Sequence, residues 1–158
     1  MLTSETSVEG IIAHQQRVGA NTIQLADAVP TGTYARLREA MPAIKLVQVI
    51  HVVGEQSLTE ALAAVAEGAD TLLLDSGNPS LAVKELGGTG WVHNWLISRQ
   101  IVEQSTVPVF LAGGFRPDNA REAIDTVRPF GLDICSGVRT NGNLDEAKLK
   151  AFFAVVRR

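Results

Sequence analysis

Short apolar runs alternate with longer amphipathic stretches along the whole chain. The apolar runs predict strands at residues 22–25, 45–50, 71–74, 108–112 and 132–134. Runs that are apolar at nearly every position are typical of parallel strands covered by helices on their faces. The stretches between them have apolar residues at helical spacing and predict helices at residues 8–18, 33–41, 58–67, 94–104, 119–127 and 144–157. This order predicts an α/β protein.

The boundaries between these elements carry helix start and stop signals. Gly19 and Gly68 directly follow predicted helices, where a left-handed residue is easiest for glycine. Ser57, residues 31–32 and residues 118–119 are candidate helix caps. Strands connected through such helices run parallel, with right-handed crossovers.

Two architectures fit this pattern, a doubly wound open sheet and a β/α barrel. A complete barrel of eight units needs roughly 200 residues or more, and the chain has 158. It has room for about six of the eight units, with residues 1–3 as the end of a strand. We therefore expect one TIM-barrel-like domain over residues 1–158, either an incomplete barrel or one that is completed by oligomerisation.

Composition narrows the classes of partner. The chain has 14 basic and 17 acidic residues and a net charge of -3, with no basic cluster, which argues against nucleic acid. No apolar run reaches the length that crosses a bilayer, so no membrane partner is expected. The one cysteine, Cys135, excludes an internal disulfide and a cysteine-based zinc site. These features indicate a cytoplasmic protein.

Candidate chemistry lies at the carboxyl ends of the strands, where ligands bind in both architectures. Asp75 directly follows a buried apolar strand, and partial desolvation there would raise its pKa and suit it to general-acid work. The alternative is an aspartate that forms a turn or caps a helix.

The last two strand ends suggest an anion site. Gly113 and Gly114 follow one strand, and Ser136 and Gly137 follow the next. Glycine turns let backbone N–H groups approach an anion closely, and barrels often bind phosphate at their last two strand ends. Residues 76–91 form the longest connection and are interpreted as a flap over a ligand or as a simple surface loop.

The order and spacing of several motifs resemble the phosphoribosylanthranilate isomerase family. The motifs are Gly87-Gly88-Thr89-Gly90, Pro108 to Gly114, Pro117-Asp118-Asn119, Val127 to Gly131 and Ser136-Gly137-Val138. The resemblance is strongest from residue 71 to residue 158 and covers roughly the C-terminal three-quarters of the family pattern. It implies a (β/α)₈-type fold and a role in tryptophan biosynthesis.

By this resemblance, the reaction is the Amadori rearrangement of N-(5′-phosphoribosyl)anthranilate from an aminoaldose to an aminoketose. Asp75 matches the general acid. The phosphate cradle would be Gly113, Gly114, Ser136 and Gly137, and the substrate would also contact Asp133 and Gly88. The family's reaction requires no metal and no organic cofactor.

The chain departs from the family pattern in its earlier units. The family's general base, a cysteine on its first strand, and an arginine after the second strand have no counterpart in the sequence, which aligns from the third strand onward. Gln24-Leu25-Ala26-Asp27 stands where the family usually has Gln-Leu-His-Gly.

Several alternatives stay open at this point. His51 could supply the missing base, or it could have a structural role. Cys135 is better explained as a small buried hydrophobe. A homo-oligomer, most simply a dimer, would cover the open sheet edges. A sugar-phosphate-binding module without catalysis and a barrel fragment that works with a partner are the competing functions.

Overall fold

The structure, a computed structural model, describes residues 1–76 and 94–157. One parallel sheet of six strands runs through it in the order β1-β2-β3-β4-β5-β6. The strands are β1 (Leu2–Thr3), β2 (Thr22–Leu25), β3 (Lys45–His51), β4 (Thr71–Asp75), β5 (Val109–Leu111) and β6 (Gly131–Leu132).

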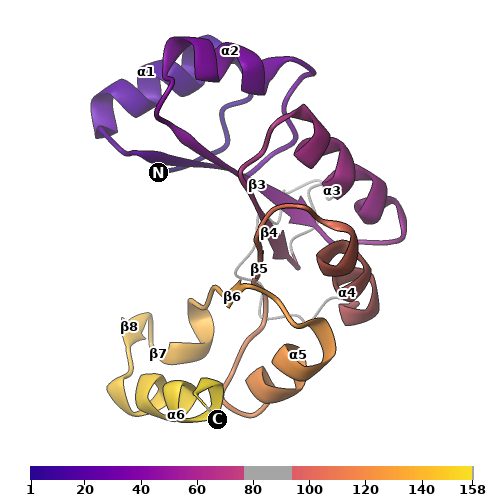
Figure 1. Cartoon of the computed structure of the whole chain (residues 1–158). Helices are drawn as coiled ribbons and strands as arrows, with labels where there is room; N and C mark the ends of the chain where they lie inside the picture. The colour runs from indigo at the N-terminus through magenta and orange to yellow at the C-terminus, as the bar shows by residue number, and fades with distance from the viewer. Residues whose placement is uncertain (77–93, 158) are drawn as a thin grey trace.

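Each strand pairs with the next one along the chain, and this decides between the two predicted architectures. A doubly wound sheet reverses its strand order at a switch point, whereas the order here never reverses. The sheet also curves, and the helices follow one another along its outer side (Figure 1). The TIM-barrel-like α/β prediction is therefore confirmed.

Helices cover the outer side of the sheet. They are α1 (Val8–Val18), α2 (Thr33–Ala40), α3 (Gln56–Glu67), α4 (Trp95–Gln104), α5 (Ala120–Val127) and α6 (Glu146–Val156). Every second residue of the central strands points toward them, and Leu46, Leu72, Leu74 and Leu111 are fully buried there. The opposite, inner side holds a smaller apolar cluster of Val49, Leu73 and Ala112. No helix in the described part of the chain is long and apolar enough to cross a membrane.

The helix ends agree with the sequence at most positions. Gly19 and Gly68 have left-handed backbones and are the C-caps of α1 and α3, as predicted. Ser57 is not a cap, because α3 begins at Gln56, two residues before the predicted start, and its N-cap is Glu55. Its hydroxyl instead donates to the carbonyl oxygen of His51 at 3.2 Å and accepts from the N–H of Val53. Ser57 thus ties α3 to the end of β3.

The last quarter of the chain differs most from the prediction. β6 covers only Gly131–Leu132, so Asp133 and Ile134 lie beyond it. A 3-10 helix, η1 (Ser136–Val138), and an antiparallel hairpin of β7 (Arg139–Thr140) and β8 (Asn143–Leu144) follow. The hairpin turns through left-handed Asn141 and Gly142, a turn signal that the sequence contains.

Candidate active site

Asp75 ends β4 on the inner side of the sheet, next to His51 at the end of β3. The two residues are direct partners in the β3–β4 register. Asp75 is only 8% exposed, and its Oδ1 accepts a hydrogen bond from the N–H of Ser76 at 2.7 Å. Burial raises the pKa of the Asp75 carboxyl, the charge of Asp133 adds to the rise, and Ser76 and His51 oppose it. A carboxyl group in this setting is suited to hold and donate a proton.

His51 is buried and oriented by a single hydrogen bond. Its Nε2 lies 3.0 Å from the carbonyl oxygen of Ala26, which follows β2. Its Nδ1 is shielded from solvent and has no hydrogen-bond partner among the described residues. Buried polar atoms are rarely left unpaired, so this nitrogen requires an explanation.

The glycine turn after β5 packs against the end of β4. Gly113 and Gly114 both have left-handed backbones, with φ of 89° and 65°. A Cβ on Gly113 would come within 2.6 Å of the Ser76 hydroxyl oxygen. The Asn119 side chain then donates to the carbonyl oxygen of Gly114 at 3.0 Å and holds the turn closed. The tight turn therefore lies beside Asp75, as the strand-end argument predicts.

The turn after β6 reaches the same region. A Cβ on Gly137 would fall 1.7 Å from the carbonyl oxygen of Phe115, so only glycine fits where η1 crosses the loop that follows Gly114. Ser136 begins η1 and is exposed. Asp133 is also exposed and is close enough to Asp75 to affect its titration. The end of β4 and the turns after β5 and β6 are thus brought together.

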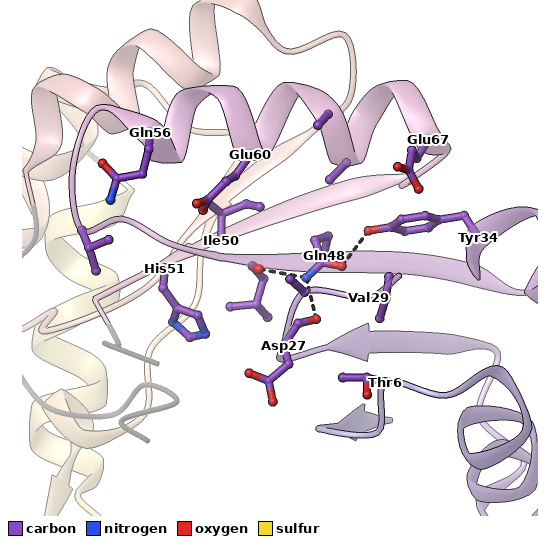
Figure 2. Close-up of a pocket in the computed structure, with 15 residues that line it drawn as sticks. Thr6, Asp27, Val29, Tyr34, Gln48, Ile50, His51, Gln56, Glu60 and Glu67 are labelled. Carbon is purple, nitrogen blue, oxygen red and sulfur yellow. Dashed lines mark hydrogen bonds between the residues drawn. The ribbon is translucent and has the colours of Figure 1, made fainter. Parts of the chain in front are cut away.

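A cavity of about 660 Å³ lies toward the first three strands rather than over Asp75. His51 and Asp27 line it from the strand ends, and α3 contributes Gln56 and Glu60. Figure 2 shows Gln56 and Glu60 directed from α3 toward β3, with His51 and Asp27 across that strand. The Tyr34 hydroxyl donates to the Gln48 side chain at 2.6 Å inside this region (Figure 2).

Gln48 is a residue that reasoning from the sequence missed. Its amide donates to the carbonyl oxygens of Leu25, Asp27 and Val49 and so joins β2 to β3. The signal was present, because Gln48 is the one polar residue inside the apolar run of β3.

A second cavity of about 510 Å³ lies on the inner side of the sheet, lined by Leu73, Phe110 and Asp133 among others.

The structure differs from the prediction made for Cys135. Cys135 is exposed, so its interpretation as a small buried hydrophobe is wrong. It lies beyond β6, the outermost strand, where no further strand of the described chain covers it.

Gly88, predicted to contact substrate, lies outside the described residues, as do the other flap glycines. Within residues 1–76 and 94–157, no group of three or more metal-ligating side chains is placed to hold an ion.

Comparison with known proteins gives one consistent answer. The family model "N-(5′-phosphoribosyl)anthranilate (PRA) isomerase" matches residues 2–155. The N-(5′-phosphoribosyl)anthranilate isomerase of Methanosarcina acetivorans is 35% identical over 98% of this chain and 66% of its own length. The chain spans about two thirds of the length of the curated relatives it matches.

Solved structures agree with the sequence comparison. The phosphoribosyl anthranilate isomerase of Thermococcus kodakaraensis superposes with a TM-score of 0.80 and 27% identity, over 100% of this chain and 73% of that one. Another phosphoribosyl anthranilate isomerase, in complex with reduced 1-(o-carboxyphenylamino)-1-deoxyribulose 5-phosphate, has a TM-score of 0.72 and 25% identity, over 99% of this chain and 69% of that one. The β/α architecture, the order of strand-end motifs and the match over residues 2–155 lead to one conclusion: the chain belongs to the N-(5′-phosphoribosyl)anthranilate isomerase family.

Proposed function

We propose that this chain catalyses the Amadori rearrangement of N-(5′-phosphoribosyl)anthranilate in tryptophan biosynthesis. The observation that carries the proposal is the buried Asp75, with its raised pKa, beside the glycine turn of Gly113 and Gly114. An acid whose pKa is raised by burial holds its proton more firmly than an exposed carboxyl and can donate it to the furanose ring oxygen, which opens the ring. The family to which the chain belongs performs this reaction.

In this proposal, the phosphate binds at the turns after β5 and β6. Gly113 and Gly114 carry no side chains of their own that would cover their backbone N–H groups, and Ser136 would add a hydroxyl from the neighbouring turn. Gly137 allows these two turns to approach closely. Asp133 and Gly88 complete the proposed substrate contacts. A solved relative that holds a ribulose 5-phosphate derivative supports a ligand of this class.

The direct test follows the loss of the fluorescence of N-(5′-phosphoribosyl)anthranilate with purified protein. We expect turnover by the wild type and a loss of about 100-fold or more in kcat for Asp75→Asn, which keeps the shape of the carboxyl but cannot donate its acid proton. Thermal stabilisation by inorganic phosphate should be equal in the two proteins. Phosphate binding by a wild type without turnover would instead identify a sugar-phosphate-binding module.

We also propose that the chain is a cytoplasmic homo-oligomer. The exposed ring of Phe130 (71% exposed) stacks edge-on against Phe110 at 5.3 Å beside the edge strand β6. An open strand edge beside an exposed aromatic ring favours self-association. Light scattering of the eluting protein tests this, and a monomer at high micromolar concentration would contradict it. Fractionation of cells that express the native gene tests the location.

A further inference from the structure

We infer that Asn119 is a positioning residue for the substrate phosphate: it holds the peptide group between Gly114 and Phe115 so that the Phe115 N–H faces the phosphate. The inference rests on the proposed function, in which the phosphate binds at the turns after β5 and β6. Asn119 is 9% exposed and directly precedes α5. It does not touch the ligand and acts through the loop that it holds.

Asn119 is the N-cap residue of α5, but its side chain does not cap the helix. An asparagine in this position usually accepts a hydrogen bond from an N–H of the first helical turn, and the Asn119 side chain makes no such bond. Its Oδ1 accepts from the N–H of Arg116 at 2.8 Å, and its Nδ2 donates to the carbonyl oxygen of Gly114 at 3.0 Å. Because an N–H only donates and a carbonyl oxygen only accepts, the orientation of the amide is fixed. The side chain therefore serves the preceding loop.

A β-turn brings Asn119 back over this loop. The N–H groups of Asn119 and Ala120 both donate to the carbonyl oxygen of Arg116, at 3.2 and 3.1 Å. Pro117 occupies the second position of the turn, where the fixed φ of proline is favoured. The turn places a short side chain with one donor and one acceptor within reach of the glycine turn that follows β5.

The geometry of the peptide group converts these bonds into a direction for the Phe115 N–H. The bond between Gly114 and Phe115 is trans, so its C=O and N–H point in opposite directions. Since the Gly114 carbonyl oxygen faces Asn119, the Phe115 N–H faces away from it. In the next peptide group the Arg116 N–H faces Asn119, and the Phe115 carbonyl oxygen faces away. That oxygen lies against Gly137, so the Phe115 N–H is on the side of the loop where η1 passes.

Two consecutive N–H groups of this loop are left for a ligand. Within residues 1–76 and 94–157, the N–H groups of Gly114 and Phe115 have no hydrogen-bond acceptor. Both residues are buried, and buried N–H groups are rarely left unpaired. Neighbouring backbone N–H groups in a turn form an anion site, and a bound phosphate would supply the missing acceptors. Without Asn119, the peptide group could rotate and turn one of these donors away.

The test compares two asparagines that stand at helix starts. Asn119→Ala removes both bonds to the loop, whereas Asn119→Asp keeps the size and the acceptor for the Arg116 N–H but cannot donate to Gly114. Asn94→Ala is the matched control, because Asn94 is the N-cap of α4 and accepts from the N–H of Leu96 at 3.0 Å.

For each protein, kcat, KM for N-(5′-phosphoribosyl)anthranilate and the unfolding temperature are measured. Dissociation constants are measured for inorganic phosphate, for reduced 1-(o-carboxyphenylamino)-1-deoxyribulose 5-phosphate and for the same compound without its phosphate. The last two ligands differ only in the phosphate group, so their comparison isolates its site.

We expect both Asn119 variants to bind inorganic phosphate and the phosphorylated analogue about tenfold or more weakly, as for the loss of one hydrogen bond to a charged group. Binding of the dephosphorylated analogue should be unchanged. KM should rise by a similar factor while kcat stays within about threefold, because the phosphate is held equally before and during the reaction. Asn94→Ala should lower the unfolding temperature and leave phosphate binding unchanged.

Unchanged binding of the phosphorylated analogue by Asn119→Ala would overturn the inference, and so would an equal weakening of both forms of the analogue. If neither Asn119 variant folded, Asn119 would be a residue that the fold itself requires, and the inference would fail as well. A wild type that binds phosphate without turnover would refute the isomerase function alone, and the binding measurements would still decide the role of Asn119. A wild type that binds neither phosphate nor the analogue would refute both.

Discussion

Two aspartates flank β4, and they lie in opposite environments. Asp70 precedes the strand, and Asp75 ends it. Burial raises the pKa of Asp70, but hydrogen bonds from the Leu46 N–H and from Arg38 outweigh that effect, so its pKa is lowered. For the Asp75 carboxyl, burial outweighs the hydrogen bonds from Ser76 and the charge of the neighbouring His51, so its pKa is raised.

The difference shows that the amino and carboxyl ends of the sheet have different roles. At the amino end, Asp70 receives the Leu46 N–H at 2.8 Å, Arg38 at 2.9 Å and Lys45 at 3.4 Å, and these bonds join α2, β3 and β4. At the carboxyl end, the Asp75 carboxyl is buried and accepts a hydrogen bond from the Ser76 N–H. In barrels the amino end is concerned with stability and the carboxyl end with chemistry. The contrast within a single strand fits that division.

The largest expected effect is on turnover. Asp75→Asn should reduce kcat about 1,000-fold, whereas Asp70→Asn should leave kcat within about threefold, because Asp70 lies at the other end of the strand. Fluorescence assays on both variants side by side test the comparison. Equal losses in the two variants would show that the ends do not differ in function.

The second prediction concerns the glycine turn at the carboxyl end. Gly113→Ala should destabilise the fold by about 3 kcal/mol, because a left-handed backbone and a close contact with Ser76 both oppose a Cβ. Gly19→Ala is the control: it has a left-handed backbone with open space around it and should cost about 1 kcal/mol. Urea denaturation measures both. If the two costs were the same, the contact with Ser76 would be contributing nothing.

The third prediction concerns the amino end. Asp70→Ala leaves the Leu46 N–H and the Arg38 guanidinium without their partner, and we expect a loss of about 2 kcal/mol in the free energy of unfolding. Asp70→Asn can still accept from Leu46 and should lose less. Chemical denaturation at pH 7 gives both values. A neutral Asp70→Ala variant would refute a stabilising role for this end.

The smallest expected effect is on the pH dependence of stability, to which Asp70 and Asp75 contribute with opposite signs. The lowered pKa of Asp70 contributes stability above its ordinary value of 3.8, and this is lost as the pH falls through the lowered pKa. For Asp75, the raised pKa means that stability is fully present below 3.8 and falls as the pH rises through the raised value.

Consequently, at pH 7 Asp75→Asn should unfold at a higher temperature than the wild type and Asp70→Asn at a lower one. The gain from Asp75→Asn should vanish below pH 3.8, where the wild-type carboxyl is protonated in both states. The loss from Asp70→Asn should vanish only at a still lower pH. Melting curves between pH 2.5 and pH 7 test both signs. The same sign for both variants would contradict the contrast.

The fold was largely predictable from the sequence, because each β/α unit is specified locally. α1 has the predicted bounds, since Ser7 caps its start and the glycine at position 19 ends it. β6 was less predictable. The apolar pattern predicts a strand at residues 132–134, whereas β6 is Gly131–Leu132, and both of its residues are only half-buried at the sheet edge. Ile134 packs against the core from beyond the strand, and this explains its apolar character.

The candidate site was predictable only in part. The rule that ligands bind at the carboxyl ends of strands identified Asp75 and the glycine turns. The sequence could not show that Asp75 and His51 are register partners, because strand register depends on how the sheet is assembled. Nor could it show that Nε2 of His51 bonds to the Ala26 carbonyl oxygen, which depends on how β2 and β3 pair.

The unbroken strand order also has a consequence for how the chain acquires its structure. Every pairing in the sheet joins a strand to its immediate predecessor, so no β segment waits for a distant partner. Each step of this topology closes a loop of one β/α unit only, which costs less chain entropy than pairing with a more distant strand. A nascent chain could therefore add one β/α unit after another as it leaves the ribosome, and the Asp75 side chain would meet His51 before the phosphate turns had been synthesised.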